Sequence, residues 1–269
     1  MKLLFTFILI ILFSTSLLGQ DNRVGTTAAT FLEMGIGSAG NAMGEAYVSV
    51  ARDLSSIYWN PSGLAYMESN EVQFMYRPWI ADINITFVGG AIFLPRIGTL
   101  ALSITSMDFG STEKTTLDMQ EGTGEMFSAT DYVVSFSYAR KLAQWFAFGA
   151  TGKFISSRIS RLSANAIAMD LGVMVNTHFF SPDGNRVNGL TIGMSISNYG
   201  TRMRYDGMEL LRPIDISEDY GNYKDVEGQF KLQSWDLPLI FRIGVSLHPI
   251  ITGSQRVTLS LDALHPNNN

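Results

Sequence analysis

The first residues that could do chemistry lie in a glycine-rich stretch, MGIGSAGNAMGEAYVSVARDLSSIYWNPSGLA, which runs from Met34 to Ala65. It contains the pattern G-x-G-x-x-G at Gly35, Gly37 and Gly40, and an acidic residue, Asp53, follows. In a dinucleotide-binding fold, such glycines let a pyrophosphate approach a helix N-terminus, and the acidic residue bonds the ribose.

A dinucleotide site also needs a buried strand just before the first glycine and a helix that begins at the third. The residues before Gly35 read DNRVGTTAATFLEM, with no apolar run of strand length. No alternation of strands with helices follows. The sequence therefore predicts no nucleotide cofactor at this stretch.

The other residues with chemical potential are three histidines, His178, His248 and His265. They lie far apart, without metal-ligand spacing, and each is expected in a turn or at a strand end. The chain has no cysteine, so it has no disulfide, thiol nucleophile or thiolate metal site. No G-x-S-x-G occurs. We expect no catalytic residue, metal or cofactor, and a protein that is not an enzyme.

Composition and the first residues indicate an exported protein. Charged residues make up only 16% of the chain, against about 25% in soluble domains. The net charge is −5 and no basic patch occurs, so nucleic acid is not an expected partner. Met1-Lys2 followed by LLFTFILIILF predicts a cleaved signal peptide over residues 1–20, the alternative being a retained anchor helix.

Beyond residue 70, apolar residues recur at every second position, as in strands whose two faces meet different surroundings. One face is apolar, and the other is small or polar, as in Asp170-Gly172 and Arg242-Gly244-Ser246. This alternation predicts nine strands. It fits a soluble β-sandwich and an outer-membrane barrel equally well.

The links between the expected strands favour the barrel. Links after strands two, four, six and eight are short, the links 108–127 and 200–235 are long, and the link after strand five is intermediate. Short turns on one side and long loops on the other are typical of outer-membrane barrels, as are aromatic residues near strand ends. Bacterial barrels have even strand numbers, and the chain ends at HPNNN. We therefore expect an incomplete barrel whose C-terminal strands are missing.

The stretch from Phe31 to Ala65, above all YWNPSGLA, resembles the start of the PorV/PorQ family of outer-membrane proteins, which belongs with the FadL-like (OMPP1) barrels. The resemblance implies an all-β transmembrane antiparallel barrel of 14 strands with an N-terminal plug. It divides the chain into a signal peptide (1–20), a plug segment (21–69) and a partial barrel of about nine strands (70–269).

On this resemblance, the plug motif comprises Gly35, Gly37, Gly40, Gly44, Asp53, Trp59, Asn60, Pro61 and Gly63. Its glycines are expected to pack against side chains of the barrel wall, some with φ > 0, and Asn60-Pro61 is expected to form a turn. Charges at Arg77, Asp170 and Arg242 are expected to face the lumen, because a charge facing lipid is costly.

The resemblance implies a location in the outer membrane and an adaptor or channel-like component of type IX protein secretion. Expected partners are outer-membrane lipid and secreted cargo proteins or secretion-system components. The alternative is a FadL-like transporter of a hydrophobic small molecule such as a long-chain fatty acid. A soluble periplasmic β-sandwich that acts as a binding module is a third hypothesis, from another class.

Overall fold

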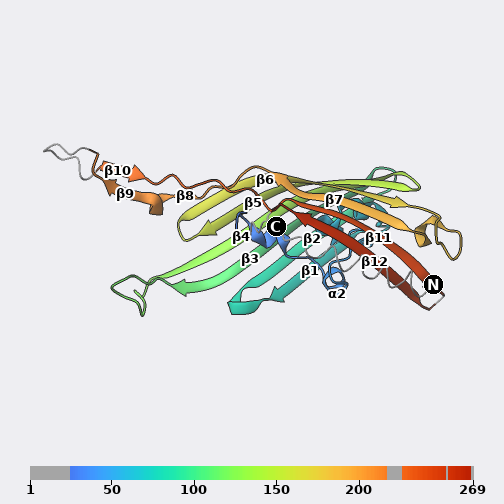
Figure 1. Cartoon of the computed structure of the whole chain (residues 1–269), viewed down its shortest axis with the longest axis horizontal. Coiled ribbons are helices and arrows are strands. Elements are labelled where there is room, and N and C mark those ends of the chain that lie inside the picture. Colours follow the sequence, from blue (N-terminus) through green and yellow to red (C-terminus); the bar gives the residue numbers. More distant parts are fainter. Residues whose placement is uncertain (1–24, 217–225, 253, 268–269) are drawn as a thin grey trace, which may run out of the picture.

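The computed structural model describes residues 25–216, 226–252 and 254–267. The predicted signal peptide lies outside these residues. The chain is all-β, and its main sheet consists of long antiparallel strands, the first seven pairing in chain order and the seventh pairing with a strand that follows a long link (Figure 1). The fold class is confirmed in this respect.

Nine strands follow one another across the main sheet, in agreement with the nine predicted from alternation. In order across the sheet they are β1 (Glu71–Pro78), β2 (Asn84–Leu94), β3 (Gly98–Glu113), β4 (Met126–Ala143), β5 (Phe146–Ile159), β6 (Leu162–Asn176), β7 (Thr191–Gly200), β11 (Ile240–Ile251) and β12 (Arg256–Pro266). Within the described residues β1 and β12 are the two edges and do not pair with each other, so the sheet is a partial barrel.

Two links differ from expectation. The link expected over 108–127 is shorter, because β3 and β4 continue past a bulge between Asp108 and Ser111 and leave only 114–125 as a turn. This extension, FGSTE in β3 and MFSAT in β4, mixes polar and apolar residues without regular alternation, so the periodic pattern could not reveal it. The link after β5, expected to be intermediate, is a tight turn at Ser160 and Arg161, with φ of 54° at Ser160.

The long link after β7 contains three short strands that alternation did not predict. β8 (Asp206–Gly207) pairs with β6 at the margin of the main sheet. β9 (Leu211–Ile214) and β10 (Val226–Gln229) form a separate two-stranded sheet, which projects from the left of Figure 1. Strands of two to four residues are too short to establish a periodic pattern.

Short helices precede the main sheet: η2 (Thr30–Glu33), α2 (Ser38–Ala42), α3 (Ser56–Trp59) and η3 (Pro61–Tyr66). Single turns, η4 (Ile80–Asp82), η5 (Arg186–Asn188) and η6 (Met208–Leu210), lie in links. Among the described residues, no helix is both long and apolar enough to cross a bilayer. We call residues 25–67 the N-terminal segment and the sheet face that contacts it the inner face; η3 packs on β4, β5 and β6.

Burial across the sheet is inverted relative to a water-soluble protein. On the outer face large apolar side chains are exposed, for example Val72 (84%), Leu261 (73%) and Ile167 (65%). On the inner face polar and charged side chains are buried, for example Asp170 (0%) and Arg242 (4%). The polar face therefore contacts the N-terminal segment, and the apolar face is left uncovered.

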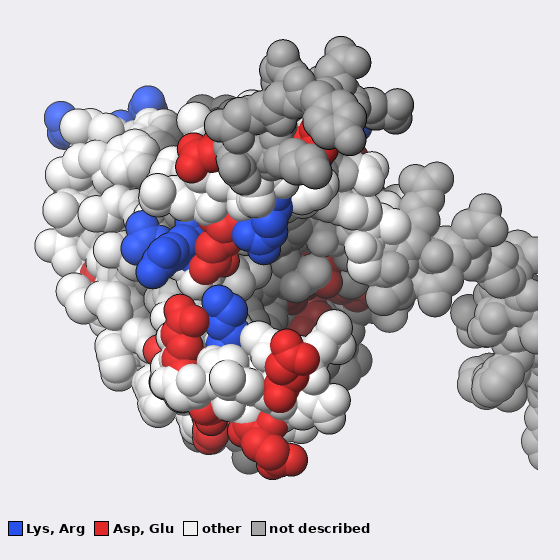
Figure 2. Space-filling model, turned by 90° about the vertical axis from the view of Figure 1, so that its left-hand side faces the viewer, with Lys and Arg blue, Asp and Glu red and all other residues white. Residues whose placement is uncertain are grey.

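The two ends of the sheet differ. The links after β1, β3, β5 and β7 lie at one end, which we call the long-loop end, and those after β2, β4, β6 and β11 lie at the other, the short-turn end. Figure 2 looks onto the left-hand side of Figure 1, where β9 and β10 lie, and shows side chains of both charge signs gathered there. Exposed aromatic residues stand at or near both ends: Tyr76, Trp79, Tyr199 and Trp235 at one, Trp145, Phe179 and Phe180 at the other.

Candidate functional site

The G-x-G-x-x-G stretch is a packing surface for an indole ring. Trp59 is fully buried, and its Nε1–H donates to the Ile36 carbonyl at 2.8 Å. A Cβ added at Gly40 would lie 2.6 Å from the indole, and one at Gly35 would lie 2.9 Å from it. Since van der Waals contact begins at about 3.4 Å, only glycine fits at these two positions. The glycines that suggested a phosphate loop therefore surround a tryptophan.

Two other glycines of the motif serve backbone conformation. Gly37 has φ of 86° and Gly44 has φ of 64°, values that residues with a side chain rarely adopt. Asp53 supports the start of α3, because its Oδ1 accepts from the main-chain N–H and the hydroxyl of Ser55 at 3.0 and 2.5 Å. All three residues shape the N-terminal segment locally.

Asn60 and Pro61 form the expected turn and also connect the segment to the sheet. The Asn60 Oδ1 accepts from the main-chain N–H of Ser62 at 3.2 Å and caps η3, while Pro61 occupies the first position of that helix. The Asn60 Nδ2 donates to the carbonyls of Val48 and of Val173 in β6, at 2.9 and 3.1 Å. The fully buried Asn60 side-chain amide thus has hydrogen-bond partners in both the N-terminal segment and the sheet.

The close approach between segment and wall depends on glycines of the wall, which the sequence reading missed. Four inward-facing glycines lie on neighbouring strands, and we call them the glycine track: Gly149 (β5), Gly172 (β6), Gly193 (β7) and Gly244 (β11). Gly149 pairs with Gly172 and Gly193 pairs with Gly244. The track lets the main chain of the segment lie directly on the sheet.

Distances along the glycine track show how close this contact is. A Cβ at Gly149 would lie 2.5 Å from the Pro61 oxygen, and one at Gly193 would lie 2.8 Å from the Ser49 Cα. Two glycines of the plug motif contact wall side chains of β1 through their main-chain atoms: the Gly37 N–H donates to the Met75 Sδ at 3.4 Å, and the Gly35 carbonyl accepts from Arg77. Gly35 and Gly40 contact the segment's own Trp59, Gly63 contacts the segment's Ala51, and the glycines that permit contact between segment and wall belong to the wall.

Hydrogen bonds tie the same main chain to the last strands of the sheet. The Asp262 Oδ2 accepts from the Val48 N–H at 2.8 Å, and the Ser260 hydroxyl donates to the Ala46 carbonyl at 2.7 Å, both from β12. In β7 the Ser195 hydroxyl donates to the Trp59 carbonyl at 3.0 Å. Small polar side chains on the inner face thus satisfy main-chain groups of a loop, at Ala46 and Val48, and of the last residue of α3, Trp59.

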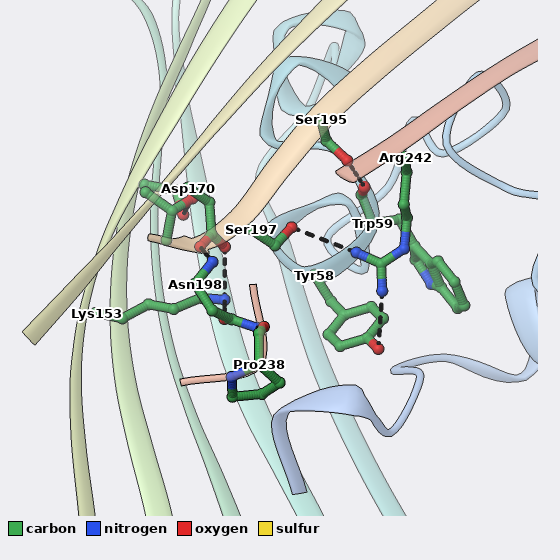
Figure 3. Close-up of polar contacts among 11 residues, drawn as sticks. Tyr58, Trp59, Lys153, Asp170, Ser195, Ser197, Asn198, Pro238 and Arg242 are labelled. Carbon is green, nitrogen blue, oxygen red and sulfur yellow. Dashed lines mark hydrogen bonds and ion pairs between the residues drawn. The ribbon is translucent and has the colours of Figure 1, made fainter. Parts of the chain in front are cut away.

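Two of the three predicted lumen charges contact the segment. The Arg242 guanidinium lies over the rings of Tyr58 and Trp59, 5.1 and 5.6 Å from their centroids, and its Nη2 donates to the Tyr58 hydroxyl at 3.2 Å (Figure 3). Burial raises the pKa of Tyr58 to about 12, so its hydroxyl stays protonated and donates to the Glu33 carbonyl at 2.8 Å. Arg77, from β1, donates to the Gly35 carbonyl at 3.2 Å.

The third charge, Asp170, lies apart from these contacts in a buried network of the wall. Its Oδ2 lies 2.5 Å from the Lys153 Nζ, and its Oδ1 accepts from the Asn198 N–H at 2.7 Å (Figure 3). Lys153 also donates to the Asn198 Oδ1 at 2.8 Å, and Asn198 donates to the Pro238 carbonyl at 2.9 Å. The sequence analysis did not identify Lys153, although the alternation in GATGKFI places it on the same inward face as Gly149 and Thr151.

The histidines are dispersed, and one differs from expectation. His248 lies within β11 on the inner face and is buried, where its ring nitrogens contact Thr258 and Arg256 at 3.1 and 2.8 Å. It was expected in a turn or at a strand end, but β11 continues beyond it to Ile251. His178 does lie in a turn, while His265 lies near the end of β12. No group of three or more potential metal ligands occurs in the described ranges.

These contacts define a class of protein: a partial β-barrel with an apolar outer face, filled on its polar inner face by its own N-terminal segment. Comparison with known families agrees with this class. Residues 18–219 match the family described as type IX secretion system protein PorV, and because this is most of the chain, the chain belongs to that family. A search of curated proteins found no match.

Proposed function

We propose that the sheet is the wall of an outer-membrane β-barrel, and that the protein serves type IX secretion as an adaptor or channel-like component and not as an enzyme. The inverted burial carries this proposal. Contiguous apolar surfaces larger than a few hundred Å² are rare on proteins in water, whereas an apolar outer face is what a barrel presents to hydrocarbon. A soluble sandwich would bury this face and expose the other.

The filled inner face favours an adaptor over an open conduit. Main-chain atoms of the N-terminal segment touch the glycine track, and Arg242, Arg77 and Asn60 are all engaged in holding it. Family membership supports secretion-system components or secreted cargo as partners. Lipid would contact the outer face, bordered by the aromatic residues at the strand ends.

The membrane part of the proposal is tested with two Leu→Arg variants, one in strand β3 and one in the turn that follows it. Leu102 is exposed on the outer face of β3, and Leu117 is exposed in the turn after β3. Arginine at a lipid-facing position costs about 2–4 kcal/mol at the bilayer midplane. We expect Leu102→Arg to reduce the heat-modifiable band in outer-membrane fractions, while Leu117→Arg leaves it unchanged. Equal levels of both variants in a soluble periplasmic fraction would refute the membrane location.

The role in secretion is tested by capture from the organism's own membranes. Protein purified from outer membranes should co-purify with secreted proteins that carry a C-terminal sorting domain, or with other secretion-system components. The same preparation is assayed for binding of a long-chain fatty acid. Fatty-acid binding without any secretion partner would contradict the adaptor role and favour transport.

A further inference from the structure

A cavity of about 360 Å³ lies at the short-turn end, between the N-terminal segment and strands β11 and β12. It belongs neither to the Trp59 packing nor to the glycine track. Two guanidiniums, an imidazole, hydroxyl groups and one carboxylate are among the groups that line it, and these belong to Arg52, Arg256, His248, Ser49, Thr258 and Asp53.

Positive charge in this cavity lacks a carboxylate partner. Within the described residues, neither Arg52 nor Arg256 has an acidic oxygen within 4.0 Å. Arg52 lies over the Tyr66 ring at 4.9 Å and donates to the Asn176 Oδ1 at 3.4 Å. Among the described residues, Arg256 has one hydrogen-bond partner, the His248 ring, at 2.8 Å. Each guanidinium has five N–H donors, so most of these donors are available to a ligand.

The remaining lining groups fit an anion. Asp53 adds one negative charge to the lining, and its Oδ1 accepts two bonds from Ser55, so two guanidinium charges face one carboxylate and positive charge remains in excess. Ser49 is 1% exposed, and its hydroxyl has no hydrogen-bond partner among the described residues. Buried hydroxyl groups are nearly always hydrogen-bonded, so an unpaired hydroxyl beside two arginines is a second sign of an absent acceptor. Burial, and then the charge of Arg256, lower the pKa of Arg52, as expected where like charges face each other.

We propose that this cavity binds a phosphate group. Guanidinium groups bind phosphate oxygens through paired hydrogen bonds, and a phosphate has enough oxygens to accept from both arginines and from the serine and threonine hydroxyls. The phosphate comes either from a soluble phosphate compound or from the headgroup of an anionic phospholipid, since this end of the sheet carries exposed aromatic residues. The site is independent of the role in secretion.

The test measures binding to the full chain, purified from outer membranes in a zwitterionic detergent, by calorimetry. The probes are inorganic phosphate and short-chain phosphatidylglycerol, with short-chain phosphatidylcholine as a net-neutral comparison. Arg256→Gln is the main variant, because Arg256 is exposed and its loss leaves the packing of the segment intact. Arg52→Lys keeps the charge and removes the planar fork. Arg96→Gln, in an exposed turn of the same end, is the matched control.

We expect an anionic probe, inorganic phosphate or phosphatidylglycerol, to bind more tightly than net-neutral phosphatidylcholine, with affinity at least tenfold weaker in Arg256→Gln, weaker in Arg52→Lys and unchanged in Arg96→Gln. Binding of inorganic phosphate identifies a soluble ligand, and binding of phosphatidylglycerol alone identifies a lipid headgroup. The proposal is overturned if neither probe binds, if phosphatidylcholine binds equally well, or if Arg96→Gln weakens binding as much as Arg256→Gln.

Discussion

Two glycines of the same strand provide a direct test of how the N-terminal segment is held. Gly149 faces the segment, and a Cβ there would lie 2.5 Å from the Pro61 oxygen and from the Ser62 nitrogen. Gly152, three residues further along β5, faces outward and has nothing within 4 Å of an added Cβ. Gly149→Ala and Gly152→Ala are therefore chemically identical changes in opposite surroundings.

The size of the effect follows from the distances. Contact at 3.4 Å would require the Pro61–Ser62 main chain to move by at least about 0.9 Å, the difference between 3.4 and 2.5 Å, and the Pro61 carbonyl carbon lies closer still. Asn60 and the glycine track prevent that movement. Overpacking of a close-packed interior costs about 1–3 kcal/mol, and main-chain atoms cannot change rotamer, so we expect the upper value. About 3 kcal/mol corresponds to a roughly 100-fold increase in release of the segment. Gly152→Ala should be neutral or stabilising by up to about 1 kcal/mol.

The assay is amide hydrogen exchange of residues 35–66 in the protein extracted from outer membranes, followed by mass spectrometry. Gly149→Ala should speed exchange in this stretch while the strands remain protected, and Gly152→Ala should leave it unchanged. Equal protection of residues 35–66 in the two variants would show that the segment does not rest on the glycine track, and the reasoning would be refuted.

Three further predictions concern polar groups. Lys153→Met should destabilise the wall by about 3–5 kcal/mol, because Asp170 is left charged and buried without its partner. Thermal aggregation of this variant should begin at a lower temperature. The double variant Lys153→Met, Asp170→Leu should recover much of the lost stability. Asn60→Ala should weaken the attachment of the N-terminal segment to the sheet by about 3 kcal/mol, because the buried carbonyls of Val48 and Val173 lose their hydrogen-bond donor. Faster proteolysis near residue 60 would report this loss. At Asp183 the N–H of Asn185, and then neighbouring side chains, lower the carboxyl pKa. The order of that turn is thus present above the ordinary carboxyl pKa and lost as pH falls through the lowered value. Protection of residues 181–188, measured relative to the intrinsic exchange rate at each pH, should fall below about pH 4, and Asp183→Asn should remove this change in protection.

The strands could be predicted from the sequence because each long strand separates an apolar from a polar face. Alternation at Leu171-Val173-Val175, opposite Gly172 and Asn176, is a local property and needs no knowledge of partners. Where polar and apolar residues no longer alternate, as in the extension FGSTE of β3 beyond Asp108, the signal disappears, although the pairing with β4 continues. Strand existence was therefore predicted, while some strand limits were not.

The sequence identified most residues of the candidate site, but it did not identify the contacts that those residues make. YWNPSGLA identified the buried Trp59 and Asn60, and the turn chemistry of Asn60-Pro61 could be read from two adjacent residues. The contact partners of the glycines could not be predicted from the sequence, because Gly149 and Pro61 are 88 positions apart and no local pattern connects them. A glycine within a strand signals a close backbone approach, but it does not say which backbone approaches.

The bonds between the N-terminal segment and β12 have a consequence for the order of folding. Val48 and Asp262 are separated by 214 positions, as are Ala46 and Ser260, whereas most strands of the main sheet pair with the next strand along the chain, the pair of β7 and β11 being the main exception. Contacts between distant positions form late, because a long loop must close before they can stabilise anything. The part of the described chain that is synthesised first thus acquires its final contacts last, and the hairpins must associate before there is a surface on which the segment can settle.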